Sequence, residues 1–181
     1  RVGTRRPWDA RLTTGDKVPN RKVVSAFSNI GVGEAGLGAL GLEVSLACEL
    51  EPLRCEVYRE INPDATVLEG SVADPSVKAS FLAGAADSFL MIATPPCQGF
   101  STLNNKTGRD GVEDPRNDLV RYSMRLAAEA SPCYFMFENV PRVMKAFQGG
   151  EIERFASEAM PGYRMSWGVV DAADYGTPQT R

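Results

Sequence analysis

Short apolar segments alternate with helix-like patterns along the chain from Val23 onwards. Segments rich in Val, Ile, Leu, Phe and Ala are typical of strands, and they predict strands at Val23–Phe27, Glu43–Cys48, Thr66–Leu68, Phe89–Ala93, Tyr134–Phe137 and Arg164–Val170. Between them, apolar residues recur with helical spacing. This spacing predicts helices at Glu34–Leu40, Pro52–Ile61, Pro75–Leu82, Asn117–Ala130 and Ile152–Met160.

The regular alternation of strands and helices predicts an α/β fold of the Rossmann-like kind. Its sheet is expected to be mainly parallel, with helices on both faces. Phe89–Ala93 and Tyr134–Phe137 are continuous apolar runs, as expected for strands covered on both faces. In the helix at Pro52–Ile61, Leu53, Val57 and Tyr58 are expected to share one face. Ligands of such folds bind beyond the carboxyl ends of the strands, so candidate chemistry is expected there.

Length and charge suggest one domain, which begins at about residue 23, preceded by a basic arm at residues 1–22. The 181 residues suit a single core, and no apolar run approaches the length of about 20 residues that spans a membrane. The net charge is −3, yet residues 1–22 carry seven basic and two acidic residues. The arm is either a solvated tail or a segment that touches phosphate. No secretory signal is visible, so we expect a cytoplasmic protein, associated with the nucleoid if it is prokaryotic.

The absence of histidine and the number of cysteines limit the possible chemistry. The chain has no His and four Cys, none of which forms a C-x-x-C pair. A zinc site needs three or four closely placed Cys or His ligands, so we expect no metal. Any general acid must be a carboxyl group, Lys, Tyr or Cys.

A glycine-rich turn follows the first predicted strand. Gly31, Gly33 and Gly36 match G-x-G-x-x-G, and Glu49 ends the second predicted strand. Such a turn admits a nucleotide close to the backbone, and the acid can accept hydrogen bonds from ribose hydroxyls. The pattern indicates an adenosine cofactor without choosing between NAD and S-adenosylmethionine. Glycines that serve only close helix–sheet packing are the alternative.

A cysteine follows the strand at Phe89–Ala93 on a stiffened backbone. Pro95 and Pro96 fix φ directly before Cys97, and Gly99 permits a sharp turn after it. A thiol held at a strand end is a candidate nucleophile. The remaining cysteines lie in strand and helix patterns and are interpreted as structural: Cys48, Cys55 and Cys133.

Five segments, taken in order, resemble motifs of the DNA cytosine-5 methyltransferase family. Pro95–Ser101 resembles its nucleophile loop, and Phe137–Val140 resembles its Glu-Asn-Val motif. The others are the second cofactor segment, the start of the helix after the nucleophile loop and the start of the Gln-x-Arg-x-Arg motif, at Glu49–Tyr58, Asp114–Leu119 and Asp171–Arg181. The resemblance runs from about Val23 to Arg181.

The resemblance implies a methyltransferase that acts on a cytosine flipped out of double-stranded DNA. Cys97 would add to C6 of the ring, Glu138 would assist at N3, and Arg181 would contact O2 or a phosphate, with Pro96 and Asn139 also in the catalytic site. The resemblance places the base or DNA near Gln98, Ser101 and Gln179. It places S-adenosylmethionine near Phe27, Ser28, Asn29, Ile30, Gly31, Glu49, Leu50, Ser71, Val72, Pro96 and Leu119. The acid role of Glu138 needs a pKa raised by desolvation.

The chain departs from the family pattern in its first cofactor motif and at its end. Ser25 stands where the family has Asp, and Ser71 stands where the family often has the Asp of a Gly-Asp pair, with Asp74 as a possible substitute. The segments that form the target-recognition domain in the family would follow Arg181. The chain is therefore expected to be truncated, disordered beyond its end, or one part of a split enzyme whose partner chain reads the DNA.

The sequence leaves three alternatives open. An RNA methyltransferase of similar sequence would share the motifs, although Gly99-Phe100-Ser101 favours DNA. A binding subunit without catalytic activity would have weak cofactor affinity. A dehydrogenase would bind NAD and form no thiol adduct. No membrane partner is expected.

Overall fold

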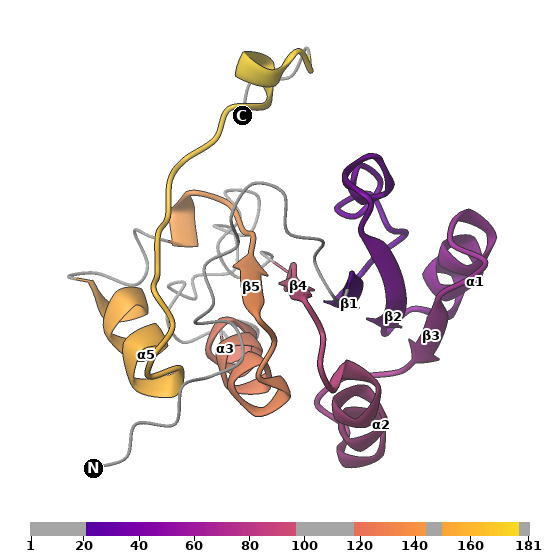
Figure 1. Cartoon of the computed structure of the whole chain (residues 1–181), viewed down its shortest axis with the longest axis horizontal. Coiled ribbons are helices and arrows are strands. Elements are labelled where there is room, and N and C mark those ends of the chain that lie inside the picture. The colour runs from indigo at the N-terminus through magenta and orange to yellow at the C-terminus, as the bar shows by residue number, and fades with distance from the viewer. Residues whose placement is uncertain (1–20, 97–117, 144–149, 178–181) are drawn as a thin grey trace, which may run out of the picture.

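Five parallel strands form one sheet in the computed structural model, which describes residues 21–96, 118–143 and 150–177. The strand order is β3-β2-β1-β4-β5, so the first strand lies at the centre (Figure 1). The bounds are β1 Lys22–Ala26, β2 Glu43–Glu49, β3 Thr66–Glu69, β4 Leu90–Ala93 and β5 Tyr134–Phe137. These five strands confirm five of the six predicted ones to within a residue at either end.

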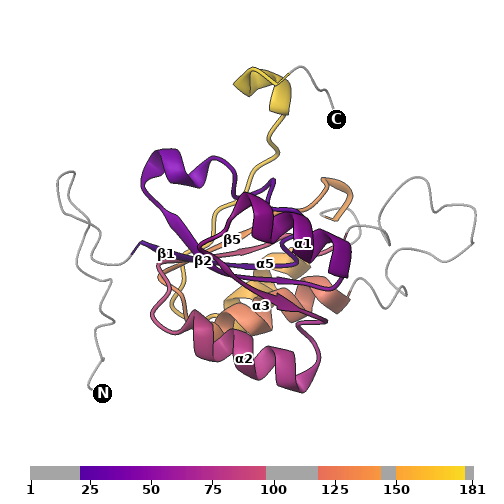
Figure 2. The same cartoon turned by 90° about the vertical axis from the view of Figure 1, so that its right-hand side faces the viewer.

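Helices cover both faces of the sheet, as predicted. They are α1 Pro52–Ile61, α2 Pro75–Ala85, α3 Asp118–Ala130 and α5 Glu151–Ala159, with short 3₁₀ helices η2 Leu37–Leu40 and η5 Ala172–Tyr175. Figure 2 shows α1 on one face and α2 and α3 on the other. Right-handed crossovers explain this arrangement, because the chain moves outwards from β2 to β3 and then reverses direction to reach β4 and β5.

Alternate residues of the central strands face the two layers of helices. Val24 of β1 lies beside Leu46 of β2 and Met91 of β4, and all three belong to the main core with Phe81 of α2. Ser25 lies one residue further along β1 and faces the opposite layer, the side of α1. Both rows are buried, which explains why the central strands read as nearly continuous apolar runs.

Three sequence predictions need correction. Arg164–Val170 is extended but pairs with no strand in the described part of the chain, so the predicted strand there is wrong. Its apolar residues Met165, Trp167 and Val169 are exposed. A segment with the sequence pattern of a strand forms one only where a partner strand supplies its backbone hydrogen bonds. The segment instead leads away from the sheet towards η5 (Figure 1).

The second correction concerns β5, which was expected to be buried on both faces. It lies at the edge of the described sheet, and Tyr134 and Met136 are exposed. Tyr134 and Met136 lie on the same face of the sheet as α1. That helix packs mainly against β2 and β3, on the other side of the central strand from β5. Phe135 and Phe137 point the other way and pack against the main core.

The third correction concerns the helices near β1 and β2. Glu34–Leu40 forms turns and only the short η2, because its two glycines, Gly36 and Gly38, disfavour an α-helix. Pro52–Ile61 is a helix with the predicted bounds, but it buries Cys55 and Tyr58 and leaves Leu53 72% exposed.

Two leucines offer a matched test of this packing. Leu126 in α3 is fully buried, whereas Leu53 in α1 is mostly exposed. Leu126→Ala is expected to lower the free energy of unfolding by about 2–5 kcal/mol, because it leaves a cavity. Leu53→Ala should change it by less than about 0.5 kcal/mol. Urea denaturation measures both, and equal losses would contradict the described packing.

Candidate cofactor and active site

The carboxyl ends of four strands meet along one edge of the sheet. Because the strands are parallel, Ala26 pairs with both Cys48 and Ala93, and Ala93 pairs with Phe137. Phe27, Thr94 and Glu138 follow these pairs and begin three neighbouring loops, and Glu49 follows Cys48 as the last residue of β2. Candidate side chains far apart in the sequence are gathered at this edge, as predicted for a parallel sheet.

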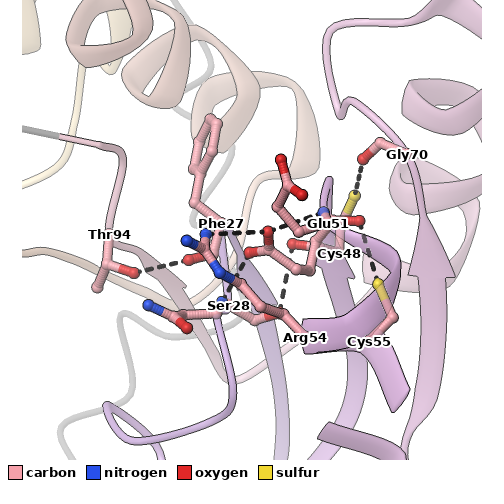
Figure 3. A network of polar contacts seen from close by, with 10 residues as sticks. Phe27, Ser28, Cys48, Glu51, Arg54, Cys55, Gly70 and Thr94 are labelled. Carbon is pink, nitrogen blue, oxygen red and sulfur yellow. Dashed lines mark hydrogen bonds and ion pairs between the residues drawn. The ribbon is translucent and has the colours of Figure 1, made fainter. Parts of the chain in front are cut away.

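The turn after β1 has an unusual backbone. Phe27 and Asn29 have φ of 59° and 52°, in the left-handed region that residues other than glycine rarely adopt. Hydrogen bonds hold this conformation: the Ser28 N–H donates to Cys48 O at 3.1 Å, and the Thr94 hydroxyl donates to Phe27 O at 2.9 Å (Figure 3). The turn is therefore tied to both neighbouring strands.

Only the first glycine of the G-x-G-x-x-G pattern is required by the structure. Gly31 has φ of 86°, and a Cβ there would lie 2.9 Å from Asn62 Nδ2 and 3.1 Å from Tyr58 Cε2. Gly33 and Gly36 have open space around them and need no positive φ. The pattern thus marks the turn correctly, but neither the dinucleotide-binding helix nor close packing explains its second and third glycines.

Glu49 connects the turn after β1 to the start of α1. Its Oε2 accepts the Asn29 N–H at 2.8 Å, and its Oε1 accepts the Glu51 N–H at 3.0 Å. Arg54 approaches Oε1 at 3.5 Å with a half-exposed side chain, a contact of little energetic weight (Figure 3). A carboxylate has about four acceptor positions, so Glu49 can hold both loops and still accept hydroxyl groups of a ligand.

The loop after β3 is fixed from the opposite face of the sheet. Val72 is buried, and its carbonyl accepts the Tyr122 hydroxyl of α3 at 2.7 Å, while Ser71 is exposed. Asp74 caps α2, since its Oδ1 accepts the N–H groups of Ser76 and Val77 at 2.9 and 3.4 Å. Its bonds to Ser76 and Val77 lower the pKa of Asp74. The structure therefore uses Asp74 as a helix cap.

The loops after β4 and β5 lie side by side. The Asn139 side chain donates to Pro95 O at 3.0 Å and accepts the Val140 N–H at 2.9 Å, and the Glu138 N–H donates to Ala93 O at 3.2 Å. These bonds place the Pro95-Pro96 segment next to Glu138 and Asn139. The Glu138 side chain is exposed, so the desolvation expected for it is not present in this structure.

Two other predicted cofactor residues flank this edge. Leu50, which follows Glu49, is 59% exposed, and Leu119 is half-buried in the first turn of α3. Five predicted residues lie outside the described part of the chain: Cys97, Gln98, Ser101, Gln179 and Arg181.

Three cysteines confirm their structural interpretation. Cys48 and Cys55 are buried in β2 and α1, and burial raises the pKa of both thiols, that of Cys48 to about 12. Burial also raises the pKa of Cys133. A thiol with a raised pKa is a poor nucleophile at neutral pH.

Sequence reasoning missed four side chains that shape this edge: Glu34, Arg54, Thr94 and Tyr122. Thr94 and Tyr122 bond backbone carbonyls 67 and 50 residues away in sequence. No local pattern marks such partners, because they meet only after the sheet has formed. For Glu34 the sequence gives one weak indication of a role at this edge, which is that this acid stands just after the glycine-rich turn.

The sequence of residues 21–181 matches the family described as C-5 cytosine-specific DNA methylase. The chain belongs to this family. The match includes every strand and helix described above, so the family assignment and the fold agree.

Curated relatives and a solved structure support the assignment. Type II methyltransferase M.AquIA of Picosynechococcus sp. is 32% identical over 173 residues, which are 89% of this chain and 68% of the relative. Type II methyltransferase M1.HgaI of Avibacterium volantium is 32% identical, over 87% of this chain and 47% of the relative. A crystal structure described as a DNA modification methyltransferase encoded within a prophage (E. coli) superposes with a TM-score of 0.70 and 28% identity, over 88% of this chain and 44% of that chain.

Two features are absent from the described residues. No helix there is long and apolar enough to cross a bilayer. No three Cys, Asp or Glu side chains in that part of the chain are grouped so that they could hold a metal ion.

Glu49→Gln tests the connection between the two loops. The amide keeps one acceptor oxygen but turns an NH₂ group towards the other backbone N–H. We expect a loss of about 1–3 kcal/mol in the free energy of unfolding, since one buried donor loses its partner. Glu56→Gln, on the exposed side of α1, is the control and should be near neutral. Chemical denaturation of both variants without cofactor measures this, and a neutral Glu49→Gln would contradict the described bonds.

Proposed function

We propose that this chain is the catalytic core of a DNA (cytosine-5)-methyltransferase that uses Cys97 as its nucleophile. The observation that carries the proposal is the position of the Pro95-Pro96 segment. It precedes Cys97 directly and is hydrogen-bonded to the loop of Glu138 and Asn139. The same strand edge holds the Glu49-bound turn, so the segment before Cys97, the loop of Glu138 and the proposed cofactor turn begin side by side from separate strands.

The loop geometry fits S-adenosylmethionine. The free acceptor positions of Glu49 suit ribose hydroxyls. The Ser71–Val72 loop and exposed Leu50 would flank the adenine, and the turn of Phe27, Ser28, Asn29, Ile30 and Gly31 would hold the methionine end. Pro96 and Leu119 would close the site from β4 and α3. When bound, S-adenosylmethionine supplies an electrophilic methyl group.

The protein groups would then act on the cytosine ring. The Cys97 thiolate forms a bond to C6, which breaks the aromaticity and makes C5 nucleophilic. Glu138 would share a proton with N3 while charge develops on the ring. Its exposed carboxyl acquires the desolvation that this role needs only when the base covers it. After methylation, a base takes the C5 proton, the C5–C6 double bond forms again and the C6–S bond breaks, which releases the Cys97 thiolate.

Substrate and partner follow from the same proposal. The base in double-stranded DNA must be flipped out to expose C6, at a cost of a few kcal/mol. Gln98, Ser101, Gln179 and Arg181 would contact it. The catalytic domain would span residues 23–181, with 1–22 as a basic arm. The chain covers 68%, 47% and 43% of three curated relatives. Target recognition is therefore proposed to need a further segment or a second chain.

Adduct formation tests the nucleophile. Duplex DNA containing 5-fluorocytosine has no proton to lose at C5, so the Cys97–C6 bond should persist after methylation. We expect a covalent adduct, visible by mass spectrometry, when S-adenosylmethionine and the whole protein with any partner chain are present. Cys97→Ser should abolish it, and Glu138→Gln should slow it by about 10²–10⁴-fold.

Cys133→Ser is the matched control, because Cys133 is a thiol on the N-terminal side of β5, away from the site edge. It should leave the adduct unchanged. An adduct that persists in Cys97→Ser would refute the assignment. No adduct with intact protein, despite binding of cofactor and DNA, would favour a binding subunit without catalytic activity.

A further inference from the structure

Glu34 is a buried acid that the proposed mechanism does not use. Glu34 and Glu49 are each 5% exposed and are the two buried carboxyl groups among the described residues. Glu34 lies three residues after Gly31, and its N–H donates to Gly31 O at 3.2 Å. It therefore belongs to the base of the same turn that is proposed to hold the methionine end of the cofactor.

The described groups around Glu34 are polar. The hydroxyl of Ser25, which is fully buried in β1, donates to the Glu34 carboxyl. From α1, Tyr58 lies against Gly31, and its buried hydroxyl has no hydrogen-bond partner among the described groups. No Lys or Arg in the described part of the chain forms an ion pair with Glu34.

The charge of Glu34 is therefore poorly compensated. Burial raises the pKa of Glu34, although its bond to Ser25 opposes this effect. Burial and the charge of Glu34 both raise the pKa of Tyr58, the titratable side chain that faces it from α1. A carboxyl in this state gains stability as an anion when a positive charge comes near, because Coulomb interactions are strong where water is excluded.

We propose that Glu34 is a specificity-determining residue that makes the turn prefer the sulfonium of S-adenosylmethionine to the neutral thioether of S-adenosylhomocysteine. The inference rests on the proposed cofactor. The two molecules share their adenosine, carboxylate and ammonium groups and differ by one methyl group and one positive charge. A buried anion beneath the turn favours the charged one. S-adenosylmethionine then displaces S-adenosylhomocysteine, the cofactor product of the proposed reaction, and this exchange speeds turnover.

A proton balance follows from this arrangement. The positive ligand lowers the pKa of Glu34, so its binding releases a proton in the pH range between the free and the bound pKa. The affinity for S-adenosylmethionine should therefore rise with pH through that range. S-adenosylhomocysteine has no charge on its sulfur and should release fewer protons.

Calorimetry on the whole protein, without DNA, tests the inference. Each ligand is titrated at several pH values in two buffers with different ionisation enthalpies, which gives the number of protons released. Wild type should release more protons with S-adenosylmethionine than with S-adenosylhomocysteine. A shift of one pKa unit would correspond to about tenfold in relative affinity. Glu34→Gln should lower the affinity ratio of the two ligands by about that factor and remove the difference in proton release.

Glu56→Gln, an exposed acid on α1, is the control and should change neither quantity. Equal proton release for both ligands in wild type would overturn the inference, and this result needs no folded variant. An unchanged ratio in folded Glu34→Gln would also overturn it. In both cases the ligands bind and the proposed function stands. If neither ligand binds the whole protein, the proposed cofactor fails and the inference fails with it.

Discussion

The carboxylate of Glu49 is the contact on which the rest of the site depends. It accepts backbone N–H groups from Asn29 and Glu51 and so joins two loops that the sheet alone would leave separate. The left-handed conformations of Phe27 and Asn29 cost about 1–3 kcal/mol each. Hydrogen bonds to a charged group contribute about 1.5–3 kcal/mol each. The two effects are of similar size, so the bond from the Asn29 N–H to Glu49 offsets part of the cost of the unusual turn, beside the bonds made by Ser28 and Thr94.

The parallel sheet supplies the second constraint. Its register brings the ends of β1, β2, β4 and β5 to one edge. Side chains from α3 and from the residue after β4 fix the loops there: Tyr122 holds Val72, and Thr94 holds Phe27. Bonding between Asn139 and Pro95 couples the loops after β4 and β5. Each loop thus begins from a rigid element, which is the arrangement that positions reacting groups from separate parts of a chain. Membership of the C-5 cytosine-specific DNA methylase family agrees with this architecture.

Much of this fold could be predicted from local patterns. Pro52 marks the first turn of α1, and the run at Leu90–Ala93 marks a buried strand, because propensity and burial agree at both places. Arg164–Val170 shows the limit of this reasoning, since a strand also needs a partner. Gly33 and Gly36 complete the G-x-G-x-x-G pattern, but neither has a positive φ or a close neighbour that requires glycine. The exposed edge of β5 depends on strand order, which periodicity does not reveal.

The candidate site could be predicted at residues whose type and position at a strand end are enough to suggest a role. Glu49 and Gly31 are of this kind, and so is the Pro95-Pro96 stiffening. Tyr122 and Thr94 were not predictable, because their partners are distant in sequence. Glu34 required the three-dimensional structure as well: only its burial against Ser25 distinguishes it from a surface acid.

A two-dimensional ¹⁵N NMR titration of the whole protein with S-adenosylhomocysteine tests most directly whether the loops joined by Glu49 hold the cofactor. If these loops hold the cofactor, the backbone amide signals of Asn29, Glu51 and Val72 shift together and saturate at one ligand concentration, while that of Ala156 in α5 stays in place. Shifts confined to other parts of the sheet, or none at these three amides while the ligand binds, would contradict this placement of the cofactor.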